Sequence, residues 1–208
     1  MSQQELLMTF SLRYVVPMVA LCSAVPLAAQ ATDPARAPIQ TLNEGLLTIM
    51  KGGSALGTKG RIARIGPVVD QTFDIGLITR LSVGPDWVKV APGDQATLVS
   101  AMRRMTVAQY ASNFSSYDGE SFSIDPRIET RGTDKLVRTT LTAPKGDTVP
   151  IGYRLRQSGG SWKIVDVYYK NAISQLATRR ADFASVFAKG GAKALIAHLD
   201  DLAAKGGR

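Results

Sequence analysis

Apolar side chains recur at helical spacing through the first half of the chain. A stripe over residues 39–50 is followed by a glycine pair at 52–53, which predicts a helix that ends at this pair. A second stripe over residues 62–73 predicts another helix, which Pro67 is expected to bend or restart because proline lacks the backbone donor. Residues 73–81 predict a third, shorter helix.

The longest helical stripe begins at Pro92 and is expected to run to about Tyr117. Pro92 suits a first helical turn, and Asp94 suits the positive end of the helix dipole. The apolar face of this helix is wide and contains methionine and aromatic side chains. Such side chains adapt well to flexible apolar ligands, although a stripe of this kind is also typical of a plain core.

From residue 119 onward the period changes to two, which predicts β-strands. The expected strands cover 121–124, 136–141, 149–155 and 162–169, and residues 157–161 are expected to form a hairpin loop between the last two. The strand at 162–169 is apolar on both faces, so we expect it to be central and covered on both sides.

Helical spacing returns after the last strand. Asn171 is expected to cap a helix that runs to a glycine pair at 190–191, and residues 195–202 form the last helix. Helices followed by a meander and two further helices predict an α+β fold with a curved antiparallel sheet of about four strands.

The N-terminal segment, residues 1–31, has the features of a secretory signal peptide. A weakly basic lead to Arg13 precedes an apolar core, and Ala29-Gln30-Ala31 ends it with small residues at the cleavage positions. A second possible start at Met8 gives a shorter leader, and an uncleaved membrane anchor is the alternative interpretation. We expect export and one domain at 32–208, with a mainly helical part at 32–117 and the sheet and C-terminal helices at 118–208.

The cysteine count and the net charge limit which bonds and binding partners the mature chain can have. The single cysteine, Cys22, lies in the leader, so the mature chain is expected to hold no disulfide and no cysteine-bound metal. For an exported chain, the formal net charge of +8 favours an anionic membrane surface or an acidic protein as the binding partner, rather than nucleic acid. The alternative is that the positive charge only aids solubility. The candidate residues for contact with a partner or a lipid head group are Arg103, Arg104, Arg179, Arg180, Lys189 and Lys193.

Little in the sequence indicates catalysis. His198 is the only histidine, and its place beside an apolar helical stripe favours packing or a surface position over serine–histidine chemistry. Residues 52–60 are glycine-rich but lack the spacing of a phosphate-binding loop, so we expect a flexible connection. Asp200-Asp201 is expected on a solvated face, and three other carboxylates are expected in turns: Asp125, Glu129 and Asp134. We therefore expect no enzyme, no cofactor and no metal site.

The C-terminal third carries a resemblance to a known family. The run from Gly159 to Val167, with Arg180, Phe183 and the glycine pair at 190–191, resembles the MlaC family, also called the toluene-tolerance or phospholipid-binding family. Upstream residues such as Trp87 fit the same pattern, so the resemblance covers most of the mature chain. Residues 173–183 look closest to the HpnM branch, which is associated with hopanoid biosynthesis.

The resemblance implies a periplasmic shuttle with an NTF2-like or cystatin-like fold, without a cofactor. Such a shuttle carries phospholipid or hopanoid between an inner-membrane lipid transporter complex and an outer-membrane lipid-transfer component. The resemblance thereby implies a role in maintaining the lipid asymmetry of the outer membrane. A lipid-free adaptor subunit and, with less support, a lipid-modifying enzyme are the alternatives. The candidate lipid contacts are Phe73, Ile75, Met102, Met105, Tyr110, Phe114, Ile151, Tyr153, Leu155, Val167 and Tyr169.

Overall fold

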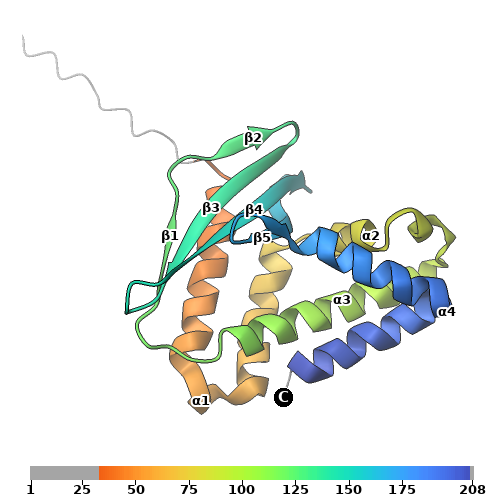
Figure 1. Cartoon of the computed structure of the whole chain (residues 1–208), viewed down its shortest axis with the longest axis horizontal. Coiled ribbons are helices and arrows are strands. Elements are labelled where there is room, and N and C mark those ends of the chain that lie inside the picture. The colour runs from red at the N-terminus through yellow and green to blue at the C-terminus, as the bar shows by residue number, and fades with distance from the viewer. Residues whose placement is uncertain (1–32, 207–208) are drawn as a thin grey trace, which may run out of the picture. The chain divides into compact units, whose positions relative to one another are not determined.

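The computed structural model describes residues 33–206, which form an α+β domain with a helical N-terminal half (Figure 1). The predicted signal peptide at 1–31 and both possible start sites lie outside the described residues. Within the described part of the chain, no helix is long and apolar enough to cross a membrane, and no cluster of three or more potential metal ligands is present.

The first helix, α1, covers Arg36–Thr72 and is kinked at two glycines. Gly53 and Gly57 have φ values of 44° and 57°, outside the helical region, so the break predicted at the glycine pair is present. The expected flexible connection at 52–60 is instead helical apart from these two residues. The helix also continues through Pro67 without the expected restart. The neighbouring Ile65 and Val69 are fully buried, and their packing outweighs the hydrogen bond that proline cannot make.

Two short elements connect α1 to the long helix. Helix α2 covers Ile75–Val83, and a 3-10 helix, η1, covers Gly84–Lys89. Helix α3 then covers Pro92–Asn113, four residues shorter than the expected end at Tyr117. The apolar stripe ends with Phe114, whose φ of −116° and ψ of 57° are not helical, and the polar residues that follow give the helix no buried face to continue.

The sheet has six antiparallel strands in the order β1-β3-β4-β5-β6, and β2 pairs separately with β3. All four predicted strands are present, and the two strands that the pattern missed are only two or three residues long. The strand bounds are β1 Ser121–Ile124, β2 Glu129–Arg131, β3 Asp134–Thr142, β4 Thr148–Ser158, β5 Ser161–Tyr169 and β6 Ile173–Ser174.

The expected central position of β5 is wrong. Its outer neighbour is the two-residue strand β6, so β5 lies one position from the sheet edge. Helices α1 and α2 and the last helix, α4 (Gln175–Gly206), all contact β5, and this covering accounts for its apolar side chains without a central position. The pairing of β5 with β4 contains a bulge beside Leu155, which increases the local twist of the sheet.

The last helix, α4, covers Gln175–Gly206 and runs beside α3 (Figure 1). Gly190 and Gly191 have non-helical backbone angles, so the predicted division into two helices is confirmed. The predicted cap, Asn171, is wrong: its φ of 56° places it in the turn before β6. The cap is Ser174, whose hydroxyl accepts a hydrogen bond from the Ala177 N–H at 3.0 Å.

Two of the three carboxylates expected in turns belong to strands. Asp134 is buried and accepts two hydrogen bonds from Arg156, at 2.6 and 2.8 Å. Glu129 pairs with two arginines of β2 and β3, while Asp125 does accept the turn hydrogen bond from Arg127 N–H at 2.8 Å. The sequence pattern placed Asp134 and Glu129 beside turns because the short strand β2 gives no periodic signal.

His198 packs inside the helical layer. Its ring meets the ring of buried Phe183 edge to face, with a centroid separation of 6.2 Å. The interaction joins the two halves of α4 across the Gly190–Gly191 break. We expected a packing role or a surface position for this histidine, and the structure shows the packing role.

Candidate functional site

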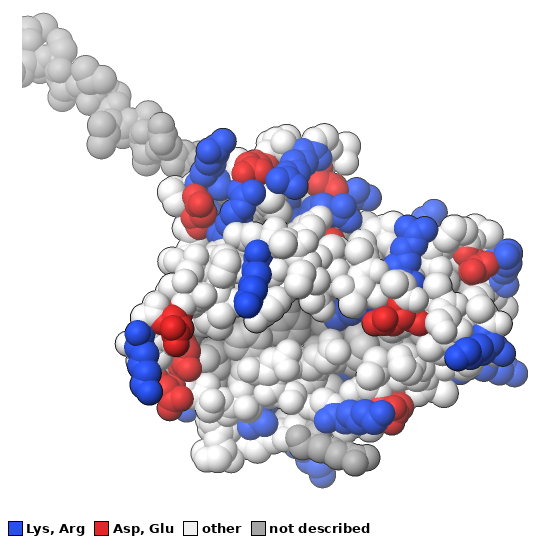
Figure 2. Space-filling view, in the orientation of Figure 1, with Lys and Arg blue, Asp and Glu red and all other residues white. Residues whose placement is uncertain are grey.

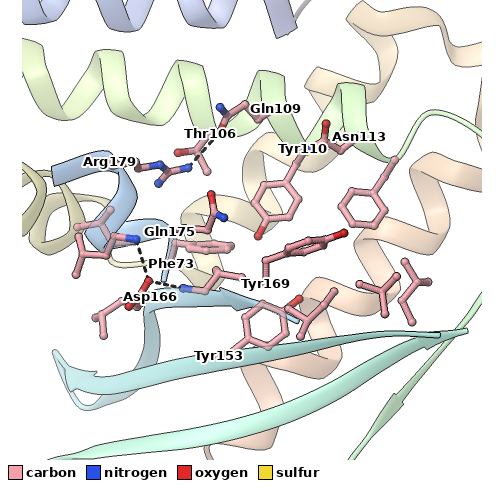
Figure 3. A pocket seen from close by; sticks show the side chains of 18 residues that line it. Phe73, Thr106, Gln109, Tyr110, Asn113, Tyr153, Asp166, Tyr169, Gln175 and Arg179 are labelled. Atoms are coloured by element: carbon pink, nitrogen blue, oxygen red, sulfur yellow. Dashed lines mark hydrogen bonds between the residues drawn. The ribbon is translucent and has the colours of Figure 1, made fainter. Parts of the chain in front are cut away.

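A cavity of about 340 Å³ lies between α3, the strands β3, β4 and β5, and the first turns of α4. Its volume is within the range of about 300–1,000 Å³ that is typical of small-molecule sites. The space-filling view shows the surface hollowed near its centre, with mostly uncharged atoms around the hollow (Figure 2). The close-up shows the cavity walls and the side chains that line it (Figure 3).

Aromatic rings form one wall. Phe73 and Tyr110 have ring centroids 5.6 Å apart, and Tyr110 stacks on Phe114 at 5.9 Å. Phe114 in turn meets Phe122 of β1 at 6.2 Å. These contacts hold the rings in place, so the apolar surface that they present to the cavity is preformed.

The sheet supplies the opposite wall. Ile151 and Tyr153 of β4 and Val167 of β5 line the cavity because alternate residues of a strand share one face. Burial raises the pKa of Tyr110 to about 12 and that of Tyr153 well above its usual value, so both phenols stay neutral donors at neutral pH. The greater part of the cavity surface is therefore uncharged.

One side of the cavity is polar, and we call Thr106, Gln109, Gln175 and Arg179 the polar patch. All four residues line the cavity and lie on α3 and α4, and Figure 3 shows them on the α4 side of the cavity. Arg179 is half-buried and donates a hydrogen bond from Nη2 to Oε1 of Gln109 at 3.1 Å. Burial lowers the pKa of the Arg179 guanidinium, although it stays protonated at any physiological pH. The patch thus puts one positive charge at a cavity whose remaining lining is mostly apolar, apart from residues such as Asn113 and Asp166.

The position of Arg179 depends on the start of α4, which Asp166 of β5 anchors. This buried carboxylate accepts hydrogen bonds from Val167 N–H at 2.8 Å, Leu176 N–H at 3.0 Å and the Ser174 hydroxyl at 2.7 Å. An acceptor at the first turn satisfies a free helix donor and complements the helix dipole. One turn later along α4, Arg179 reaches the cavity.

The predicted lipid contacts divide into two groups in the structure. Ile75, Met102, Met105 and Leu155 are buried core residues outside this cavity, and Ile75 borders a second, more polar cavity beside Asp70. The other seven predicted contacts line the cavity together: Phe73, Tyr110, Phe114, Ile151, Tyr153, Val167 and Tyr169. Whether any of these residues contacts a ligand stays a prediction.

The predicted basic contacts are spread over the surface, apart from Arg179. Arg103 pairs with Asp70 through two hydrogen bonds of 2.6 and 2.7 Å, and Arg104 pairs with Asp200 at 2.6 Å. The expected solvated position of Asp200 therefore includes this ion pair. Arg180 lies against Gly84, whereas Lys189 and Lys193 are exposed on α4.

Sequence reasoning missed the polar residues of the cavity. Thr106, Gln109 and Asn113 follow one another at spacings of three and four on α3, so they form a polar stripe beside the buried apolar residues of the helix. That interruption of an apolar face was a usable signal. Gln175 gave no comparable signal, since its position depends on where α4 begins.

Comparisons with known proteins point to one family. The family model described as "MlaC protein" matches residues 40–201. A solved structure of the phospholipid-binding protein from Ralstonia solanacearum, in complex with a phospholipid, is similar with a TM-score of 0.70 and 25% sequence identity. The alignment covers 85% of this chain and 100% of that one. A search of curated proteins gave no match. The comparisons do not bear on the HpnM branch, which stays a prediction.

Proposed function

The chain belongs to the MlaC family, and on this basis we propose that it binds a membrane lipid in the cavity and carries it through the periplasm. The observation that carries the proposal is the preformed apolar cavity between α3 and the sheet. The similar structure from Ralstonia solanacearum, described with a bound phospholipid, supports phospholipid as the ligand class.

The cavity suits the physical problem of moving a lipid through water. Exposing hydrocarbon to water costs about 0.8 kcal/mol per methylene, or roughly 12 kcal/mol for a 16-carbon chain. The fixed rings of Phe73, Tyr110 and Phe114 and the aliphatic side chains of the sheet remove a chain from water without first having to form a pocket. The protein acts by binding, and release follows when a partner competes for the lipid or opens the cavity.

The location and partners belong to the same proposal. The signal-like segment at 1–31 and the formal charge of +8 support an exported protein that meets anionic membranes or acidic partners. We expect it to exchange lipid with an inner-membrane transporter complex and an outer-membrane component. Residues 173–183, which resemble the branch linked to hopanoids, keep hopanoid as the second candidate cargo.

Mass spectrometry of organic extracts from natively purified protein tests the proposal. We expect near-stoichiometric lipid from the wild type and at least tenfold less from Val149→Trp, which places an indole in the cavity. Val88→Trp is the matched control, because Val88 is 81% exposed and does not line the cavity. Circular dichroism and thermal melting check that both variants are folded.

Other outcomes overturn the proposal in different ways. Wild-type protein without any lipid supports the adaptor alternative, and added lipid recovered as a chemically altered product supports an enzyme. Equal lipid in Val149→Trp and Val88→Trp places the binding site elsewhere. The mass of the extracted lipid decides between phospholipid and hopanoid.

A further inference from the structure

We infer that the polar patch binds the phosphate group of the lipid, so that the cavity selects phosphate-bearing amphiphiles over uncharged ones with the same hydrocarbon chain. This inference rests on the proposed function and adds the chemical class of the bound head group. Thr106, Gln109, Gln175 and Arg179 carry it.

Arg179 carries a positive charge that no ion pair neutralises within the described part of the chain. Among the described residues, Arg103, Arg104 and Arg156 each pair with a carboxylate, whereas Arg179 forms no ion pair. Its one hydrogen bond goes to the neutral amide of Gln109. A guanidinium has five N–H donors, so donors remain for a ligand. A half-buried charge without a partner is costly, and an anionic ligand removes that cost.

Asp166 attracts the charge of Arg179 and partly offsets the effect of burial on its pKa, but the two side chains form no ion pair or hydrogen bond within the described part of the chain. It is the only carboxylate among the described residues that line the cavity, and it is 5% exposed. Its oxygens already accept hydrogen bonds from Val167, Ser174 and Leu176. These bonds hold Asp166 to the start of α4 and use its oxygens as acceptors there. The guanidinium therefore stays available to the cavity.

Thr106 supports the same assignment independently of Arg179. It is 2% exposed and lines the cavity, and its Oγ1 has no hydrogen-bond partner among residues 33–206. A buried hydroxyl without a partner costs about 1–3 kcal/mol. Figure 3 shows Thr106 beside Gln109 and Arg179, facing the same side of the cavity. An acceptor that reaches Arg179 is therefore placed to accept from this hydroxyl as well.

The balance of donors and acceptors identifies the ligand group. The guanidinium, the Thr106 hydroxyl and the amide of Gln175 all present donors to the cavity, while the Gln109 carbonyl is already used by Arg179. A phosphate offers several acceptor oxygens and a negative charge, which matches a donor-rich site around an arginine. The neighbouring wall of Phe73, Tyr110 and Phe114 then receives the chain.

Isothermal titration of delipidated protein with two soluble single-chain lipids tests the inference. Lysophosphatidic acid and monoacylglycerol with identical acyl chains differ only in the phosphate. We expect wild-type protein to bind the phosphate lipid at least tenfold more tightly, the range for a hydrogen-bonded charge. Arg179→Gln should weaken binding of the phosphate lipid far more than binding of monoacylglycerol, and so remove most of this preference. Thr106→Val reduces the preference about threefold.

Arg180→Gln is the matched control, since Arg180 is the next residue on α4 and lies against Gly84 outside the cavity. We expect it to bind both lipids like the wild type. Inorganic phosphate at millimolar concentration should give no heat, because the chain supplies most of the affinity; strong binding of inorganic phosphate alone overturns the inference.

Two further results separate the inference from the proposed function. Equal affinity of the wild type for both lipids, or an equal loss for both in Arg179→Gln, refutes the phosphate site and leaves lipid binding intact. Binding of neither lipid by the folded wild type refutes the proposed function itself.

Discussion

Asp166→Asn tests whether Asp166 holds the start of α4, and with it Arg179, beside the cavity. The substitution keeps the shape of the side chain but removes the charge that accepts three hydrogen bonds at the start of α4. The new amide also turns one acceptor oxygen into a donor. Because Asp166 is 5% exposed, water cannot take over the lost interactions. The first turn of α4, and with it Arg179, is therefore expected to loosen.

The magnitude follows from the three bonds. A hydrogen bond to a charged group contributes about 1.5–3 kcal/mol and a neutral one about 0.5–1.5, so each bond weakens by about 1 kcal/mol. The three together give a loss of about 3 kcal/mol in the free energy of unfolding. For a domain of this size each kcal/mol lowers Tm by about 2–4 °C, so we expect a drop of roughly 6–12 °C.

Urea denaturation and thermal melting, followed by circular dichroism, measure this loss. Asp182→Asn is the control, because Asp182 is an exposed residue of the same helix, and its change should stay within about 0.5 kcal/mol. A loss below about 1 kcal/mol for Asp166→Asn, or equal losses in both variants, would falsify the anchoring role of Asp166.

Three further predictions concern the core, the acid stability and the kink of α4. Met102 is a fully buried core residue outside the cavity. Met102→Ala should lower the free energy of unfolding, measured by urea denaturation, by about 3 kcal/mol without reducing the lipid bound per folded molecule. A loss of lipid at unchanged stability contradicts this. The hydrogen bonds from Arg156 hold the pKa of Asp134 below 3.8, so the pair stabilises the fold above that pH and this contribution is lost as pH falls through the lowered pKa. Asp134→Asn should therefore flatten the fall of the urea midpoint between about pH 5 and 2, and an unchanged slope excludes the pair as its source. Gly191→Ala should cost about 1–2 kcal/mol because Gly191 has a φ of 62°, and a thermal melt like that of the wild type opposes this.

The elements with a strong local signal could be predicted from the sequence. Alternation gave strands β3, β4 and β5, and the glycine pair at 190–191 marked the division of α4, since glycine alone adopts those backbone angles without strain. The start of α4 was missed because it depends on Asp166, a residue that is remote in sequence from the free N–H of Leu176. Local propensity at Asn171 carries no information about that contact.

The cavity was predictable only in part, for a physical reason. Met102 and Tyr110 lie on the same apolar face of α3, and the sequence pattern gives both the same burial. Whether a buried side chain meets another side chain or an empty space depends on how far α3 stands from the sheet, which periodicity does not encode. Tyr110 borders the cavity and Met102 is core. The polar stripe from Thr106 to Asn113 was the one local sign of the difference.

A crystal structure with a brominated phospholipid tests the central claim most directly. Bromine on one acyl chain gives an anomalous signal that locates the chain without interpretation of weak density. We expect bromine between α3 and the sheet, within van der Waals distance of residues such as Ile151 and Tyr153. Bromine on the outer surface, or an unoccupied cavity in protein that carries stoichiometric lipid, contradicts it.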